Sequence, residues 1–429
     1  YHDTSPLSEW DWQAVLDGQV ALSGTDGQTL RLAHELADAS SVEVTLLTPN
    51  PGTTPSATLA SQVAVDTFPE AVHHAHAHQL DVLVFVNAQR PEIPEGVARA
   101  EALRQPCIAW CKNGPWRPLR SLYATTDAIR RVICVTRPHA DIFRDKTVFS
   151  KIEVIPNGID AEWYRPAPDT SPDPNRVCYV GALTPDKGFH HLAQVWPSVR
   201  QSTPSARLTV VGSARLYDRS ETLGPLNVAR PEYEHTQIVP FLGSTRAEAR
   251  HRHGVDFRGL TPPRSLRTIM QNSSLGVVNP NLTIGNSLET FCVSAVEFQA
   301  AETAVIGARR RGLRETVQHE ETGLLINSQR ELESALSRLL NQPEEARRMG
   351  KQGQRWVTET FDFSTVVQRW HRVLDAIVQG KPPDPPAFSL RRATPKTMLR
   401  EGIRRFHSMG AANRLSLLDD LIGMIRDSR

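Results

Sequence analysis

The chain repeats one pattern twice: short, continuously apolar segments typical of buried strands alternate with segments whose apolar residues recur at helical spacing. In the first third, strands are predicted over residues 42–47, 81–86, 107–110 and 132–135. Strands that are apolar on both faces are typical of a parallel sheet covered by helices on both sides. The pattern therefore predicts an α/β domain built on a parallel sheet.

The same pattern resumes later in the chain. Strands are predicted over 177–180, 208–211, 276–278 and 304–306, and helices over 331–340, 344–358 and 364–378. A proline-rich stretch predicts a linker between the two blocks. The predicted fold is α/β, with two doubly wound, Rossmann-like domains facing a cleft. The expected divisions are 1–163, the linker 164–176, the second domain 177–360, a helix returning toward the first domain over 361–380, and a proline-rich hinge with a basic helical tail over 381–429.

Charge and cysteine usage exclude some classes of function. With 49 basic and 47 acidic residues, the chain offers no electrostatic case for a nucleic-acid partner. No apolar run reaches transmembrane length, and no signal peptide is evident. The five cysteines are few and lie mostly in apolar segments, which predicts buried, reduced thiols in a cytoplasmic protein.

The tail from Leu390 to Arg429 combines basic and apolar residues at helical spacing. Such a helix can pack across the domains or at an oligomer interface, or it can lie on an anionic membrane surface. The second alternative predicts a peripheral contact with the inner face of the membrane. The residues concerned are Arg391, Arg392, Lys396, Arg400, Arg404 and Arg405, alternating with Met398, Leu399, Ile403 and Phe406.

Two glutamates, Glu289 and Glu297, are separated by seven residues where a polar, turn-prone segment enters an apolar helix. We expect Glu289 at or just before the helix N-terminus and Glu297 about two turns in. Main-chain N–H groups at a helix start favour anionic or oxygen-rich ligands, and carboxylates accept hydrogen bonds from hydroxyls. The pair therefore indicates a polyhydroxylated ligand, although two glutamates on an ordinary surface helix are the alternative.

A second motif, Gly181-Ala-Leu-Thr-Pro-Asp-Lys-Gly188, follows a predicted strand and opens a predicted helix. A glycine-bearing turn with a lysine can hold a nucleotide diphosphate through main-chain N–H groups and one ammonium. An ordinary turn with a surface lysine is the alternative.

Together with Ile155-Pro-Asn-Gly-Ile-Asp160 and Leu208-Thr-Val-Val-Gly-Ser213, these motifs resemble retaining glycosyltransferases of the GT-B fold, of the GT4 type. The resemblance implies transfer of a sugar from a nucleotide diphosphate donor to a cell-surface glycan, a lipid-linked acceptor or a small sugar. No cofactor besides the donor is implied. Because no Asp-x-Asp motif occurs in the chain, we expect no metal ion. A catalytically silent scaffold that binds nucleotide sugar or glycan is the alternative.

In the second domain, the resemblance assigns Glu289 to the donor-sugar hydroxyls and Glu297 to both ribose hydroxyls. It places the segment Thr290, Phe291 and Cys292 near the diphosphate, together with Gly181 and Lys187. Ala182 stands where the family commonly has an arginine that grips the diphosphate. This departure implies either weaker binding of the donor phosphates or a transfer of that role to another residue, for which Arg215 is the candidate. Phe257-Arg258-Gly259 matches the loop that lies along the nucleobase, which adds Arg258 to the donor-binding residues.

In the first domain, Gly24 and Gly27 match the glycine-rich loop that the family places near the donor phosphate and the acceptor. Asn113 or Lys112 stands where many members have a histidine near the reacting carbon. The expected catalytic residues are therefore Glu289, Lys187 and Asn113, with no assigned general base.

Overall fold

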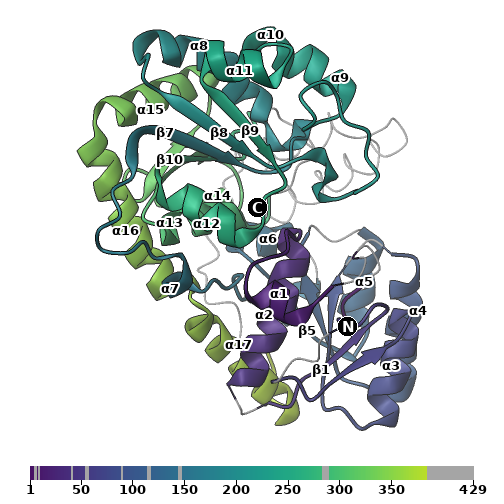
Figure 1. Ribbon diagram of the computed structural model, residues 1–429. Coiled ribbons are helices and arrows are strands. Elements are labelled where there is room, and N and C mark those ends of the chain that lie inside the picture. The colour runs from purple at the N-terminus through teal and green to yellow at the C-terminus, as the bar shows by residue number, and fades with distance from the viewer. Residues whose placement is uncertain are drawn as a thin grey trace, which may run out of the picture. The chain divides into compact units, whose positions relative to one another are not determined.

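The computed structural model describes residues 1–3, 7, 10–39, 42–53, 58–87, 90–113, 117–143, 147–282 and 289–383. The predicted basic tail and its membrane contact lie outside these residues. In the described part, two parallel sheets of four and six strands carry the fold, and a further parallel pair joins β1 to β2 (Figure 1). Within these ranges, no helix has the length and apolarity needed to span a bilayer.

The N-terminal sheet has the strand order β3-β4-β5-β6, and every pairing in it is parallel. Its strand β4 is buried at every position, as its continuous apolar run predicts. The first predicted strand begins later than expected, as β1, and pairs with β2. The elements are α1 (Trp12–Leu16), α2 (Gly24–Asp38), β1 (Thr45–Thr48), β2 (Ser61–Ala64), α3 (Phe68–Ala77), β3 (Leu83–Asn87), α4 (Glu92–Leu103), β4 (Cys107–Cys111), α5 (Arg117–Thr125), β5 (Ile129–Cys134), α6 (Arg137–Ala140), η1 (Asp141–Phe143), η2 (Thr147–Lys151), β6 (Ile152–Val154) and α7 (Ala161–Tyr164).

The C-terminal sheet has the order β12-β11-β10-β7-β8-β9, again wholly parallel. The first half of its elements is β7 (Asp173–Val180), η3 (Pro185–Lys187), α8 (Phe189–Ser202), β8 (Arg207–Val211), η4 (Ala214–Leu216), α9 (Pro231–Tyr233), η5 (Glu234–Ile238), α10 (Val239–Leu242), α11 (Arg246–His253) and β9 (Val255–Gly259). The second half is α12 (Pro263–Gln271), β10 (Ser273–Val278), α13 (Val293–Ala300), β11 (Ala304–Ala308), α14 (Leu313–Thr316), β12 (Gly323–Ile326), α15 (Gln329–Asn341), α16 (Pro343–Phe361) and α17 (Phe363–Val378).

Separate hydrophobic clusters cover the two faces of this sheet, which explains its continuously apolar strands. Val177 and Tyr179 of β7 pack into the cluster that contains Trp196 of α8 and residues of α15. The intervening residue Cys178 packs into the other cluster, with Phe298 of α13 and residues of α16. Alternate side chains of one strand thus enter two cores, so both sets must be apolar.

Helix α17 packs on the N-terminal sheet although it follows the C-terminal one in the chain. Its residues Val366 and Trp370 share a cluster with Ile108 and Trp110 of β4. The rings of Trp110 and Trp370 meet edge to face, with centroids 5.1 Å apart. This packing ties the end of the described chain to the first sheet.

The structure corrects two local predictions. The predicted linker is too long, because β7 already begins at Asp173. Proline suggested a linker there, but Pro174 stands at the second position of the strand, and proline is tolerated near a strand start. Gly24 and Gly27 do not form a loop. They lie in the first turn of α2, where the side chain of Ser23 caps the helix by accepting from the Asp26 amide.

Candidate donor-binding site

Lys187 and Glu289, two of the predicted site residues, form an ion pair with 2.9 Å between Nζ and Oε2. The side-chain amide of Asn279 donates to the same oxygen at 2.7 Å. Burial lowers the pKa of Lys187, but the neighbouring Glu289 carboxylate and Tyr217 outweigh it, and the net shift is upward. Lys187 is therefore a persistent cation beside a carboxylate that already accepts two hydrogen bonds.

The turn that carries Lys187 requires glycine at its end. Gly188 has a φ of +70°, and a Cβ there would lie 2.5 Å from the main-chain nitrogen of Asn281. Both the backbone conformation and the close approach exclude a side chain. Asn281 in turn donates from its side-chain amide to the carbonyl of Asp186 at 2.7 Å. These contacts hold the Lys187 turn against the segment that follows β10.

The main chain of Glu289 and Thr290 is held by contacts from three separate elements. The amide of Gly312 donates to the Glu289 carbonyl at 3.0 Å. The Thr290 hydroxyl donates to the carbonyl of Lys112, at the end of β4, at 2.5 Å, and the Thr136 hydroxyl donates to the Thr290 carbonyl at 2.8 Å. Glu289 is thus positioned by residues that lie at the ends of β4, α6 and α14. The sequence motifs do not indicate this role for Thr136 and Gly312.

The segment continues into α13, which begins at Val293, with Phe291 and Cys292 both buried. Burial raises the pKa of the Cys292 thiol to about 12, so the side chain is neutral at physiological pH. All five cysteines are free and buried, as the sequence predicts. Cys292 therefore contributes a compact neutral group beside the Glu289 segment.

Glycines bring the ends of β7, β8 and β9 together. Gly212 has a φ of +135°, and a Cβ there would overlap the carbonyl oxygen of Gly181. Its amide donates to the Gly259 carbonyl at 2.9 Å. Because parallel strands end at the same edge of the sheet, this edge presents main chain that a ligand can approach closely.

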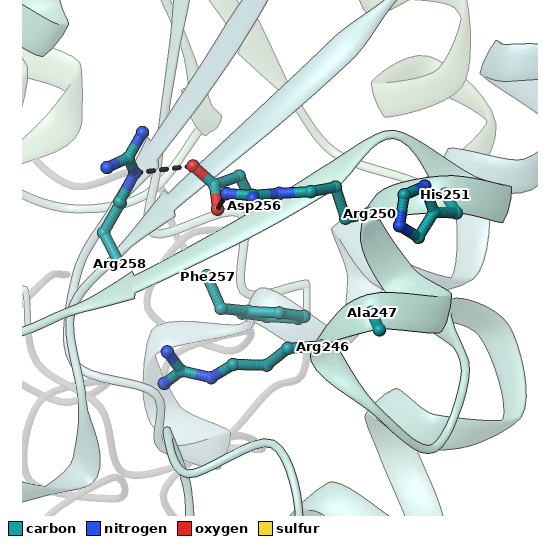
Figure 2. A pocket seen from close by; sticks show the side chains of 7 residues that line it. All are labelled: Arg246, Ala247, Arg250, His251, Asp256, Phe257 and Arg258. Atoms are coloured by element: carbon teal, nitrogen blue, oxygen red, sulfur yellow. Dashed lines mark hydrogen bonds and ion pairs between the residues drawn. The ribbon is translucent and has the colours of Figure 1, made fainter.

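The two predicted arginines are engaged elsewhere. Arg215 donates from Nε to the carbonyl of Glu221 at 2.8 Å, so its side chain organises its own loop. Arg258 pairs with Asp256 at 2.5 Å and lines a cavity of about 510 Å³ (Figure 2). The other residues around that cavity are Arg246, Ala247, Arg250, His251, Asp256 and Phe257. Neither Lys187 nor Glu289 lines it, so the structure does not bring the Arg258 side chain to the ion pair.

Glu297 lies apart from the ion pair, in a small cavity of about 100 Å³ that Gly24 and Gly27 also line. Its Oε1 accepts a hydrogen bond of 2.7 Å from the hydroxyl of Tyr164. Burial raises the pKa of Glu297, while the Tyr164 hydrogen bond and Arg31 oppose that shift. The structure thus brings three predicted residues together and adds Tyr164, which no motif indicated.

Lys112 and Asn113 follow each other at the end of β4 but face different surroundings. The Lys112 amino group is buried; its Nζ donates to Asn157 Oδ1 at 2.7 Å and lies 3.2 Å from the centre of the Trp110 ring. Asn113 is exposed. Of these two residues, Asn113 is the one accessible to a ligand. It follows Lys112, whose carbonyl accepts a hydrogen bond from the Thr290 hydroxyl, so Asn113 lies near Thr290.

The buried Lys112 predicts a pH dependence of stability. Burial lowers its pKa well below the ordinary value, so between that lowered pKa and about pH 10 the unfolded chain binds more protons at this residue. Its contribution to the free energy of unfolding must therefore rise with pH over this range. We expect the free energy of unfolding of wild type, measured by urea unfolding, to rise relative to that of Lys112→Met between pH 6 and pH 9. The prediction would be contradicted if the difference in free energy of unfolding between the two proteins stayed constant or fell over this pH range.

Two family models match this chain. The model described as "Glycosyl transferases group 1" matches residues 160–356, and the one described as "Glycosyltransferase Family 4" matches residues 23–163. The chain belongs to the GT4-type glycosyltransferases. The matched ranges contain every predicted donor residue as well as Gly24 and Gly27.

Relatives of this GT4-type glycosyltransferase include a GDP-mannose-dependent alpha-(1-6)-phosphatidylinositol monomannoside mannosyltransferase of Mycobacterium tuberculosis, 26% identical over 58% of this chain and 62% of the relative. A D-inositol 3-phosphate glycosyltransferase of Corynebacterium glutamicum is 30% identical over 47% of this chain and 46% of the relative. The chain therefore matches less than two thirds of the length of these relatives.

Solved structures share the GT-B fold. Sucrose-phosphate synthase from Thermosynechococcus elongatus superposes with a TM-score of 0.66 at 18% identity, covering 85% of this chain and 97% of that one. Anabaena HepE in complex with UDP-glucose superposes with a TM-score of 0.62 at 15% identity, covering 87% and 98%. Two parallel-sheet α/β domains of the GT-B type are thus shown, as the sequence predicts.

Proposed function

We propose that this GT4-type glycosyltransferase transfers a sugar from a nucleotide diphosphate donor with retention of anomeric configuration and without a metal ion. The ion pair of Lys187 with Glu289, beside the glycine-rich ends of the strands, carries this proposal. The Lys187 ammonium would stabilise charge on the departing diphosphate, and Glu289 would accept hydrogen bonds from the hydroxyls of the donor sugar. Asn113 would lie on the acceptor side.

In the proposed reaction, the bond between the anomeric carbon and the diphosphate oxygen breaks, and the acceptor oxygen forms its bond on the same face. The acceptor proton passes to the departing phosphate oxygen, so no protein base is required. Catalysis then depends on positioning and on stabilisation of diphosphate charge. The two relatives named above are both described as transferases, so the comparison does not favour the alternative of a catalytically silent scaffold.

The acceptor is proposed to be lipid-linked, a growing cell-surface glycan or a small phosphorylated sugar-like molecule. Two relatives support this range, because their names specify phosphatidylinositol monomannoside and D-inositol 3-phosphate. A donor screen should come first, since donor binding does not require the acceptor.

We expect one class among UDP-, GDP- and ADP-sugars to raise the melting temperature. A donor at 100 times its Kd stabilises the fold by about 2.7 kcal/mol through mass action. Glu297→Ala should remove most of this shift because it removes the proposed ribose acceptor. Glu359→Ala, which changes an exposed glutamate on α16, is the matched control.

With the donor known, the anomeric configuration of the product should be determined by NMR with and without EDTA. Retention with unchanged rate in EDTA is the expected result. Inversion, or loss of activity in EDTA, would contradict the proposed mechanism. Stabilisation by no nucleotide sugar would contradict the proposed function itself.

A further inference from the structure

Tyr217 has the most exposed ring among the phenylalanine, tyrosine and tryptophan residues that the structure describes. Its relative exposure is 58%, whereas each of the other five tyrosines is at most 9% exposed. Singly exposed apolar side chains are common on protein surfaces, so the surroundings of Tyr217 must show whether a ligand covers its ring. Those surroundings belong to the candidate donor-binding site.

The loop that carries Tyr217 begins where strand β8 ends. Strand β8 lies between β7 and β9, so its C-terminal end is at the same edge of the sheet as the Lys187 turn, which follows β7. The amide of Ala214 donates to the carbonyl of Val228 at 2.8 Å, and Arg215 donates from Nε to another carbonyl of the loop at 2.8 Å. The order of the strands thus places Tyr217 next to the Lys187 turn, on a loop that is held in shape by its own hydrogen bonds.

The hydroxyl end of Tyr217 lies at the ion pair of Lys187 with Glu289. Among the groups whose electrostatic effect raises the pKa of Lys187, Tyr217 has the largest effect after Glu289. Burial raises the pKa of Tyr217, while Lys187 lowers it and Glu289 raises it. The hydroxyl is thus shielded from water although the side chain as a whole is 58% exposed. The hydroxyl therefore points toward the ion pair, and the ring remains open to solvent.

These neighbours mark the sugar end of the proposed donor site. Lys187 is proposed to hold the diphosphate and Glu289 the sugar hydroxyls. The other groups that act on the pKa of Tyr217 are Asp186 and Cys292, which belong to the same two segments. A sugar ring carries hydroxyls at its edge and C–H groups on its faces. The open ring of Tyr217 can exclude water from such a C–H face while Glu289 accepts hydrogen bonds from the hydroxyls.

We propose that the ring of Tyr217 packs against the C–H face of the donor sugar, so that it contributes to binding of the sugar and not of the nucleotide. This inference rests on the proposed function, in which the sugar of a nucleotide diphosphate donor reaches Glu289. It adds a substrate-contacting residue that no sequence motif indicated. Arg215, which the sequence suggested for this loop, bonds within the loop instead.

The test measures two affinities by isothermal titration calorimetry, one for the nucleotide diphosphate and one for the corresponding nucleotide sugar. The nucleotide sugar is the one among UDP-, GDP- and ADP-sugars that raises the melting temperature of wild type most. Tyr217→Ala should lower the affinity for the nucleotide sugar by about 5–10-fold, the scale of one aromatic contact. Its affinity for the nucleotide diphosphate should stay within about twofold of wild type, because the ring does not contact that part of the donor.

Tyr217→Phe keeps the ring and should bind both ligands within about twofold of wild type. Val378→Ala is the matched control, because Val378 is 61% exposed at the end of α17 and its removal should change neither affinity. If Tyr217→Ala does not fold, Tyr217→Leu, which lacks a planar ring, provides the same comparison of the two ligands.

Equal losses for the nucleotide diphosphate and the nucleotide sugar in Tyr217→Ala would overturn the inference, because the ring would then contact the nucleotide. Unchanged affinity for both ligands would also overturn it, because the ring would then not contact the donor. If no nucleotide sugar stabilises or binds the wild-type protein, the proposed function fails instead.

Discussion

Replacing Lys187 with methionine is expected to lower kcat by about 10²–10³-fold, the range found when one donor that stabilises developing negative charge is removed. The ammonium is held 2.9 Å from Glu289, and that neighbour shifts its pKa upward, so Lys187 stays protonated in the wild-type site. Methionine has similar length but no charge. The decrease should appear in kcat more than in KM, because charge on the diphosphate grows as the bond to the sugar breaks.

Loss of Lys187 also leaves the Glu289 carboxylate with Asn279 as its one remaining hydrogen-bond partner among the described residues, which should destabilise the fold. The double variant Lys187→Met with Glu289→Gln separates the two effects. It removes the unpaired charge, so stability should recover while turnover stays low. Lys351→Met, at an exposed position on α16, is the control for the change of side chain. Near-wild-type turnover in Lys187→Met would exclude Lys187 from the catalytic site.

Replacing Gly312 with alanine is expected to lower kcat/KM by about 100-fold, the scale expected when reacting groups are misplaced by about 1 Å. A Cβ at this position would overlap the Thr290 carbonyl oxygen and lie 2.8 Å from the Phe291 nitrogen. Because these are main-chain atoms, the Glu289 segment must move to relieve the contact. The Gly312 amide also donates to the Glu289 carbonyl, so the displacement reaches the site carboxylate directly.

Gly323→Ala is a matched control for that prediction. A Cβ at Gly323 would overlap the Val305 carbonyl oxygen, a comparable main-chain contact within the pair of β11 and β12. Both variants should lose stability in thermal unfolding, but only Gly312→Ala should lose activity per folded molecule. Equal activity of the two variants, normalised by active-site titration with donor, would show that the Gly312 contact does not position Glu289.

The sequence predicted the elements well where the signal is local. The apolar run of β4 and the alternation of Val177, Cys178 and Tyr179 follow from burial on both faces of a parallel sheet. The prediction was wrong where a local signal had two meanings. Proline near Asp173 suggested a linker but stands at a strand start, and the glycines before Gln28 suggested a loop but form the first helical turn.

Side-chain directions were harder to predict than main-chain positions. The motif Phe257-Arg258-Gly259 suggested a loop, but these residues form the end of strand β9, where the Gly259 carbonyl accepts from the Gly212 amide. The Arg258 side chain, however, turns to Asp256 two residues earlier in the same strand, and Arg215 turns to Glu221 in its own loop. Each arginine side chain points toward its own local hydrogen-bond or ion-pair partner. A sequence motif does not identify that partner.

By itself, the sequence determined the two parallel-sheet domains, the free buried thiols and the membership in a glycosyltransferase family, because these depend on local patterns along the chain. Only the tertiary structure decided which groups meet. The Thr290 hydroxyl reaches a carbonyl 178 residues away, and the Tyr164 hydroxyl donates to Glu297 across 133 residues. A carboxylate's role depends on which groups surround it. Those groups come from segments that are brought together only when both sheets and their connecting helices pack.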